Sequence, residues 1–217
     1  MSKHTPVIRL IGVLCLAVVM SACAGTARVE EKRTESVTVT HPPRVVIENF
    51  NGNIDVAIGA GDKVTAEVTK FAEPGVQDVL KDIQFAISQD SQTVTLKASW
   101  PADKPGPGGA GVDLKVSIPA GSPVQAAIGN GNITYHGALG DGNYNFEVGN
   151  GSIELKLPAE SQFAVNATVG NGHTTSEFPL SSGTPDSRVI RGTVGSNPSA
   201  SITATTGNGR IDILRGN

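Results

Sequence analysis

From residue 44 onward, apolar and polar residues alternate along the chain, as expected for β-strands that bury one face. This alternation fills residues 45–70, returns at 83–99 and appears again at 112–118. Only residues 73–81 have the apolar spacing of a helix. The pattern therefore predicts an all-β fold with one short helix. In the first run, the apolar positions that define the alternation are Val46, Phe50, Ile54, Val56, Ile58, Val64, Ala66 and Val68.

A short unit, Gly-Asn-Gly, recurs four times in the second half of the chain, each time between strand-like runs. Its asparagines are separated by 20, 21 and 37 residues, and a less complete copy lies near residue 51. Asn-Gly is favoured where the backbone takes a positive φ, because glycine has no Cβ to clash and asparagine tolerates the left-handed region. The predicted turn residues are Asn51, Gly52, Asn130, Gly131, Asn150, Gly151, Asn171, Gly172, Asn208 and Gly209.

Two architectures explain these units. Each Asn-Gly is either the corner of a β-solenoid coil of about 20 residues or the tip of a two-residue hairpin. The solenoid, which is a parallel β-helix-like fold, stacks Ile133, Ile153, Thr174 and Ile211 in successive coils. A hairpin pairs Val148 with Ile153 instead and gives an antiparallel meander or sandwich. Side chains keep one register after every Asn-Gly, which favours the solenoid; the hairpin meander is the alternative.

Composition narrows the class of protein. The chain has 26 glycines but only nine aromatic residues, and 17% of its residues are charged, so it is neither a charged disordered chain nor a protein with a large aromatic core. A net charge of −3 without a basic cluster argues against nucleic-acid binding. We expect one β-repeat domain over residues 44–217, interrupted by a Pro/Gly-rich loop at residues 101–111.

The N-terminus carries the features of an export signal. Two basic residues precede an apolar run of 11 residues, which is too short to span a bilayer, so residues 1–22 are predicted to be a signal peptide. Its end, Met20-Ser21-Ala22-Cys23, resembles a bacterial lipobox. That resemblance implies cleavage after Ala22 and acylation of Cys23, which would hold the protein at a membrane. Residues 23–43 would then form the lipidated cysteine and a polar tether.

The sequence offers little catalytic chemistry. The mature chain has three scattered histidines and none of the common catalytic or nucleotide-binding motifs, so we expect no enzyme activity, no cofactor and no small-molecule substrate. Asp141, Asn143, Asn145 and Glu147 resemble the start of a calcium loop, but the required glycine and final glutamate are missing. We therefore interpret these four residues as the outer face of a strand and expect no metal. A second outward row, formed by Asp55, Thr134, Glu154 and Asp212, is interpreted as a solvated face.

The lipobox, the first Asn-Gly-Asn-Ile unit, the short helix, the turn at residues 118–121 and the serial Asn-Gly units together resemble the bacterial "putative adhesin" family of β-strand-repeat lipoproteins. This is a domain of unknown function related to the head-GIN domains of auto-transporter-like adhesins. The resemblance covers residues 44 to the end. It implies a β-helix-like envelope protein without established catalytic residues. The unit at His173 departs from it, because Thr174 stands where an apolar residue is usual.

These observations give two hypotheses for function. The first is a lipid-anchored bacterial envelope protein, at an outer membrane facing the periplasm or at the cell surface, that acts as an adhesin-like binding or scaffold module. Its partners would be the membrane, through the anchor, and an envelope protein or glycan. The alternative is an accessory or sensing partner in an envelope-stress system that acts by protein–protein contacts, for example by pairing of an edge strand.

Overall fold

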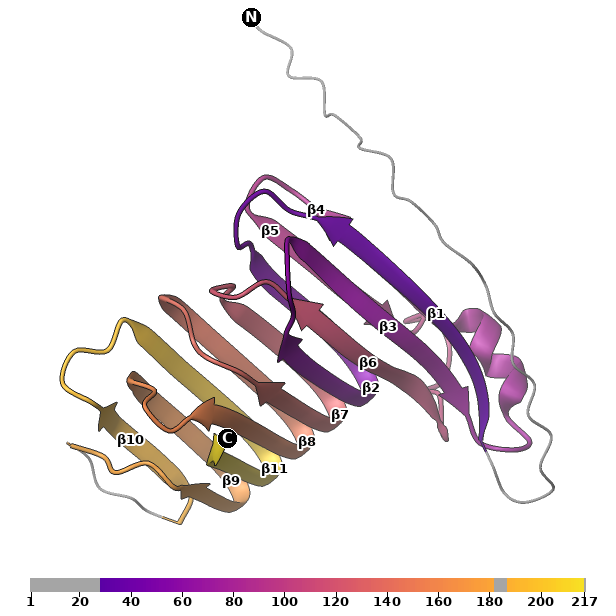
Figure 1. The fold of residues 1–217 in the computed structure, drawn as a ribbon. Helices are drawn as coiled ribbons and strands as arrows, with labels where there is room; N and C mark the ends of the chain where they lie inside the picture. The colour runs from indigo at the N-terminus through magenta and orange to yellow at the C-terminus, as the bar shows by residue number, and fades with distance from the viewer. Residues whose placement is uncertain (1–27, 182–186, 217) are drawn as a thin grey trace, which may run out of the picture.

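In the computed structural model, which describes residues 28–181 and 187–216, eleven strands form one mixed sheet (Figure 1). The predicted all-β fold is confirmed. The predicted signal peptide at 1–22 and the predicted lipidation site Cys23 lie outside the described residues. Within the described part of the chain, no helix has the length and apolar character needed to cross a membrane. The strands are β1 (Val29–Thr38), β2 (Arg44–Ile58), β3 (Lys63–Ala72), β4 (Gln84–Gln89), β5 (Thr93–Ser99), β6 (Ala110–Ile118), β7 (Val124–His136), β8 (Gly142–Pro158), β9 (Phe163–Ser176), β10 (Val189–Val194) and β11 (Ala200–Gly216).

Every Asn-Gly unit lies inside one of the five long strands, β2, β7, β8, β9 and β11. Neighbouring long strands run parallel and keep the units in register, so that the five asparagines follow one another across the sheet. Val148 and Ile153 belong to the same strand, β8, and pair with different residues of its neighbours. The hairpin alternative is therefore wrong for these units.

The order of the long strands differs from their order in the sequence. It is β2-β7-β8-β11-β9, so the C-terminal strand lies between β8 and β9. Ile211 consequently pairs with both Ile153 and Thr174, and the predicted stack in chain order is wrong at this point. The cause lies in the long interval before the last unit. It contains β10, which pairs antiparallel with β9 and takes the position beyond it, so β11 pairs on the other side of β9.

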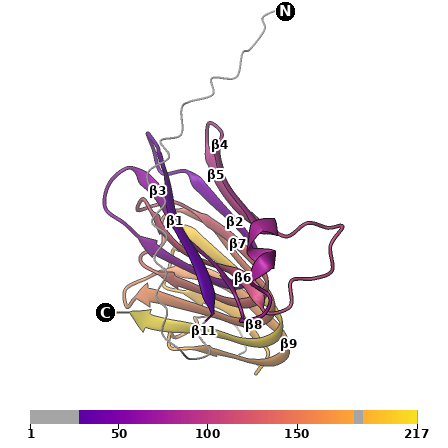
Figure 2. The ribbon, with the colours of Figure 1, turned by 90° about the vertical axis from the view of Figure 1, so that its right-hand side faces the viewer.

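Each long strand bends at its Asn-Gly unit, and we call the parts before and after the unit its N-terminal and C-terminal halves. In β2 the buried residues are Val45 and Ile47 before the unit and Ile54 and Val56 after it. The prediction placed Val46 in the buried set; the alternation changes phase at the corner, so Val45 and Ile47 are buried in its place. Figure 2 shows the long strands curving around a common interior.

The core lies between the two layers that these halves form. The ring of Tyr135, in the C-terminal half of β7, is 5.9 Å from the ring of Tyr144 and 5.8 Å from that of Phe146, both in the N-terminal half of β8. All three side chains are buried. The two halves of the long strands therefore face each other across a shared hydrophobic core.

At the N-terminal end of the sheet, the two layers contain different numbers of strands. Beside β2, strands β5 and β4 extend the layer of N-terminal halves, whereas β6, β3 and β1 extend the layer of C-terminal halves. Because β1 pairs with β3 over its whole length, the predicted polar tether at 23–43 is wrong from Val29 to Thr38. Five side chains of this segment are charged, four of them consecutive, yet the segment forms a regular strand. The charge run in the sequence concealed this strand.

Two smaller elements complete the fold. The helix expected at 73–81 is a single 3₁₀ helix, η1 (Gln77–Asp82), which buries Leu80. The Pro/Gly-rich loop expected at 101–111 ends earlier, because β6 begins at Ala110. Trp100, at the start of this loop, donates a hydrogen bond from its Nε1 to the carbonyl oxygen of Pro105 at 2.9 Å.

Glycine at the corners is required by two constraints. Gly131, Gly151, Gly172 and Gly209 all have φ between 130° and 145°. A Cβ on any of them would overlap the carbonyl oxygen of the glycine on the neighbouring strand. Each corner glycine thus lies directly against the backbone of the neighbouring strand, a contact that no larger residue permits.

We expect Gly151→Ala to lower the free energy of unfolding by about 3 kcal/mol or more, because it combines an unfavourable φ with a backbone clash. Gly61→Ala provides a control: its φ is 92°, but an added Cβ there meets nothing within 4 Å, so we expect a loss of about 1 kcal/mol. Gly108→Ala, which has neither constraint, should change stability by less than about 0.5 kcal/mol. Urea unfolding measures all three, and equal losses for Gly61 and Gly151 would contradict the stacking argument.

Candidate binding groove

The outer surface of the C-terminal halves contains a groove with a volume of about 520 Å³, which we call the polar groove. Its lining combines the small side chains of Thr134 and Ser152, on β7 and β8, with longer ones on β6, β8 and β11. Because side chains alternate across a strand, the same alternation that buries the core side chains exposes these polar residues. The polar lining residues are Asn53, Asp55, Asp113, Lys115, Asn132, Thr134, His136, Ser152, Glu154, Lys156 and Arg210.

Equivalent positions of successive strands form rows across the groove. The residue after each Asn-Gly gives one row, in which Asn53, Asn132 and Ser152 are in register. Asn132 donates from its Nδ2 to the Oδ1 of Asn53 at 3.0 Å, and the backbone N–H of Ser152 donates to the Oδ1 of Asn132 at 3.1 Å. The row therefore supplies amide groups about 4.8 Å apart, the spacing of neighbouring strands.

The next row contains the residues that were interpreted as a solvated face. Pairing aligns Asp55 with Thr134, Thr134 with Glu154, and Glu154 with Asp212. Three of these four line the polar groove, so the row is part of a concave surface and not of a flat solvated face.

Carboxylates and basic groups alternate within the groove. Glu154 pairs with Lys156 at 2.6 Å, and the Nε2 of His136 lies 3.6 Å from the Oδ1 of Asp55. Lys115, which pairs in register with Asp55 on the neighbouring strand, is exposed and forms no ion pair with the described residues. The groove thus offers both signs of charge together with amides and hydroxyls, which suits a polar ligand that carries several donors and acceptors.

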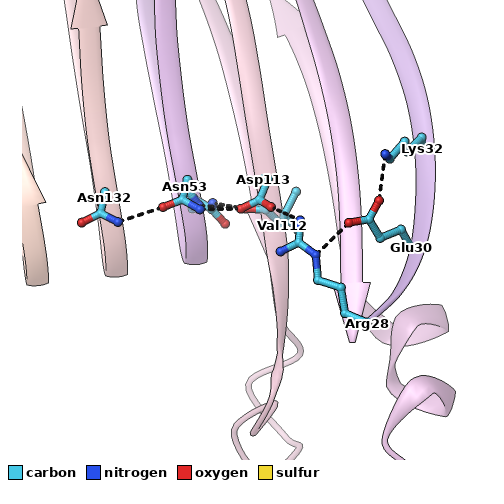
Figure 3. Close-up of polar contacts among 8 residues, drawn as sticks. Arg28, Glu30, Lys32, Asn53, Val112, Asp113 and Asn132 are labelled. Atoms are coloured by element: carbon cyan, nitrogen blue, oxygen red, sulfur yellow. Dashed lines mark hydrogen bonds and ion pairs between the residues drawn. The ribbon is translucent and has the colours of Figure 1, made fainter. Parts of the chain in front are cut away.

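A polar network links the groove to the start of the described chain (Figure 3). Asp113 accepts hydrogen bonds from the Nδ2 of Asn53 at 2.9 Å and from the Nη2 of Arg28 at 2.7 Å. Arg28 also pairs with Glu30, which pairs with Lys32. Hydrogen bonds from Lys32 and Arg28 lower the pKa of Glu30. Burial opposes the charge of Arg28, yet its two carboxylate partners raise its pKa overall. This network connects Arg28, just before β1, to Asp113 at one side of the groove.

The predicted turn asparagines form a second ladder along the corner. The Nδ2 groups donate from Asn171 to Asn208, from Asn208 to Asn150, and from Asn150 to Asn130, over 2.7 to 2.9 Å. Asn130 continues the series to Asn51, which donates to the carbonyl oxygen of Ala110. All five amides point the same way. The asparagines and the glycines beside them are therefore placed by the in-register pairing of the long strands, at one side of the polar groove.

The four residues of the incomplete calcium motif do not converge. Asn143, Asn145 and Glu147 alternate with the buried Tyr144, Phe146 and Val148, so they follow the outer face of β8 at intervals of two residues. Asp141 accepts a hydrogen bond from the hydroxyl of Ser199. Over residues 28–181 and 187–216, no group of three or more histidine, cysteine, aspartate or glutamate side chains could hold a metal ion.

Several groove residues were not recognised in the sequence. Arg28 and Asp113 lie 85 positions apart, and no local pattern connects them. The residue after each Asn-Gly was the available signal, since Asn53, Asn132, Ser152 and Arg210 all occupy that position. Their common position predicts a shared row, although not the curvature that makes the row part of a groove.

Comparison of sequences identifies no relative: no protein-family model matches the chain, and no curated protein matches it. Comparison of structures, in contrast, finds similar proteins. The chain superposes on a putative cell adhesion protein from Clostridium sporogenes with a TM-score of 0.54 and 13% identity, over 86% of this chain and 100% of that one. The two proteins share a fold. At this identity the similarity establishes the fold and not the function.

Two further structures are more distant. A putative adhesin from Parabacteroides merdae has 12% identity and a TM-score of 0.36, over 84% of this chain and 80% of its own. A putative adhesin from Bacteroides fragilis has 10% identity and a TM-score of 0.29, over 85% of this chain and 97% of its own. These scores are too low to support a structural inference.

The asparagine ladder predicts a graded effect of substitution. Asn150→Ala removes two ladder hydrogen bonds, one that Asn150 donates and one that it accepts from Asn208. Asn171→Ala removes one ladder hydrogen bond, which Asn171 donates to Asn208. We expect losses of about 2 and about 1 kcal/mol respectively, from about 1 kcal/mol for each bond. Urea unfolding of the two variants measures the difference. A larger loss for Asn171→Ala would show that the ladder does not act as a series of equivalent bonds.

Proposed function

We propose that this protein is a lipid-anchored, non-catalytic module of the bacterial cell envelope that binds a glycan or protein partner through the polar groove. In this proposal the stacked coils form a solenoid that serves as a rigid scaffold, and the acylated Cys23 holds the scaffold at the membrane. The fold shared with a putative cell adhesion protein supports an adhesin-like role.

The polar groove is the observation that carries the proposal. Across the groove, three strands present the same kinds of polar group at the strand spacing, with carboxylates on β2 and β8 at either side of Thr134. A ligand with repeating hydroxyl, amide or charged groups could engage several rows at once, and many modest contacts add up to useful affinity. The groove lacks aromatic side chains among its lining residues, so hydrogen bonds and charge would dominate binding.

The network from Lys32 to Asn132 suggests why β1 matters for this role. It connects Arg28, which directly precedes β1 and follows Cys23 by five residues in the sequence, to Asp113 of the groove. A membrane anchor at Cys23 would therefore be close in sequence to a residue that contacts the binding surface.

The test compares two matched pairs of carboxylates. Asp55→Asn with Glu154→Gln removes two charges that flank Thr134 in the groove, and Glu48→Gln with Glu147→Gln removes two that flank Ala127 on the opposite outer face. In a sedimentation assay with purified cell-wall sacculi, and in a parallel assay with detergent-solubilised envelope proteins, we expect the groove pair to bind about tenfold more weakly, equivalent to about 1.4 kcal/mol. The control pair should bind like the unsubstituted chain.

Equal weakening by both pairs would indicate non-specific electrostatic binding. If neither pair changes binding to either preparation, the polar groove is not the binding surface. Thermal unfolding of each variant separates loss of binding from loss of structure.

A further inference from the structure

We propose that the free edge of β4 is a second interaction site, which accepts one extended segment of a partner protein as an added strand. The site is separate from the polar groove and does not depend on it. Main-chain hydrogen bonds would supply affinity and alternate side-chain contacts would supply specificity, as in other cases of strand addition.

The hydrogen-bonding groups of β4 point alternately toward β5 and away from it. The backbone N–H of Asp90 donates to the carbonyl oxygen of Thr93 at 3.0 Å, which sets the phase of this antiparallel pair. Residues 84, 86 and 88 therefore bond to β5, and the backbone groups of Phe85, Ile87 and Gln89 point outward. Among the described residues, β4 pairs only with β5. Three consecutive outward positions are thus available to another strand.

This edge lacks the protection found at the other ends of the sheet. The sequence of β4, Gln-Phe-Ala-Ile-Ser-Gln, has no charged residue. Strand β1 carries five charged residues, which is a common means of preventing edge pairing. At the opposite end, the backbone N–H and the hydroxyl of Ser181 both donate to the carbonyl oxygen of Thr193 on β10. The β4 edge is consequently the one best suited to accept a strand.

The two layers indicate how large the added element is. Beyond β2, the layer that contains β4 has two strands, whereas the layer that contains β1 has three. The inner face of β1 therefore extends one strand beyond β4. That face presents Glu31, Arg33 and Glu35, which pair in register with inward-facing residues of β3. A single strand added to β4 would lie opposite them and complete the shorter layer.

One side chain of β1 already contacts this edge. The Nη2 of Arg33 donates to the carbonyl oxygen of Phe85 at 2.9 Å, and its guanidinium lies 5.4 Å from the centre of the Phe85 ring. Arg33 also pairs with Glu35 at 3.0 Å. An incoming backbone N–H would replace Arg33 at the Phe85 carbonyl, while the pair with Glu35 can persist. Arg33 thus occupies one hydrogen-bond acceptor of the free edge, and an incoming strand can displace it.

The same geometry argues for a partner segment and against a second copy of this chain. In a symmetric dimer joined through β4, the longer layer of each copy would extend over the other copy by one strand. The β1 strand of one copy would then occupy the place of β3 in the other. A single extended segment avoids this overlap. The net negative charge of Glu31, Arg33 and Glu35 further favours a segment with a basic residue facing inward between two apolar residues.

The test uses the purified full-length chain and the capped heptapeptide Thr-Val-Thr-Lys-Thr-Val-Thr, which has this pattern. Amide hydrogen exchange followed by NMR should slow at least tenfold at Phe85, Ile87 and Gln89 when the peptide is saturating. Exchange at Ala86 and Ser88, already bonded to β5, should not change. Of two peptide analogues that are N-methylated on alternate sets of residues, one should lose binding at least tenfold and the other should keep it.

Two protein variants complete the design. Arg33→Gln should strengthen peptide binding at least threefold, because it removes the side chain that covers the Phe85 carbonyl, whereas the control Arg191→Gln on β10 should not. Asp55→Asn with Glu154→Gln should leave peptide binding unchanged, which keeps this site distinguishable from the polar groove. The proposal is overturned if millimolar peptide fails to slow the three amides, if both methylated analogues bind equally, or if the chain dimerises with protection at β4.

Discussion

Contact between the corner glycine of one long strand and the backbone of the next determines how close the long strands lie and where they bend. A Cβ at Gly131 or Gly151 would overlap a carbonyl oxygen on the adjacent strand, and their φ values lie where other residues are strained. Because the glycines stack, the asparagines before them stack too, and their amides form one continuous series of hydrogen bonds. The bend then places the two halves of each strand around a shared core and leaves two different outer faces.

Those faces, and the ends of the sheet, explain how a protein with few chemically reactive residues can still have distinct functions. The outer surface of the C-terminal halves contains the polar groove, lined by charged residues such as Asp55, Glu154 and Lys156, whereas the opposite surface presents Asn145, Glu147 and Thr203 in register or at intervals of two. The edges differ as well: among the described residues, β4 pairs with one strand and has no charged residue, whereas the edge strand β1 carries five. The proposed binding by the groove and the proposed strand addition at β4 therefore use different parts of one scaffold and need not exclude each other.

The sequence predicts much of this fold because the repeat is local. Alternation predicted the strands, and the recurring Asn-Gly units predicted positions that turn out to be aligned corners. The sequence pattern could not predict that β11 inserts between β8 and β9, because pairing of parallel strands depends on contacts between distant residues. The charge run at Glu30–Glu35 suggested a tether, although its residues form a regular strand whose partners on β3 lie 31 to 41 positions away. The polar groove depends on curvature, and on long-range contacts such as that between Arg28 and Asp113, which no local pattern encodes.

The most direct test of the stacked corners is a measurement of which strands are neighbours. Glu147, Thr205 and Thr168 are in register on β8, β11 and β9, with their side chains on the same outer face. In a chain whose Cys15 and Cys23 are replaced by serine, cysteine pairs at 147 and 205 and at 205 and 168 should form disulfides readily, because adjacent strands are about 4.8 Å apart. A pair at 147 and 168, two strands apart, should not. Efficient crosslinking of 147 to 168 without crosslinking of 147 to 205 would contradict the account.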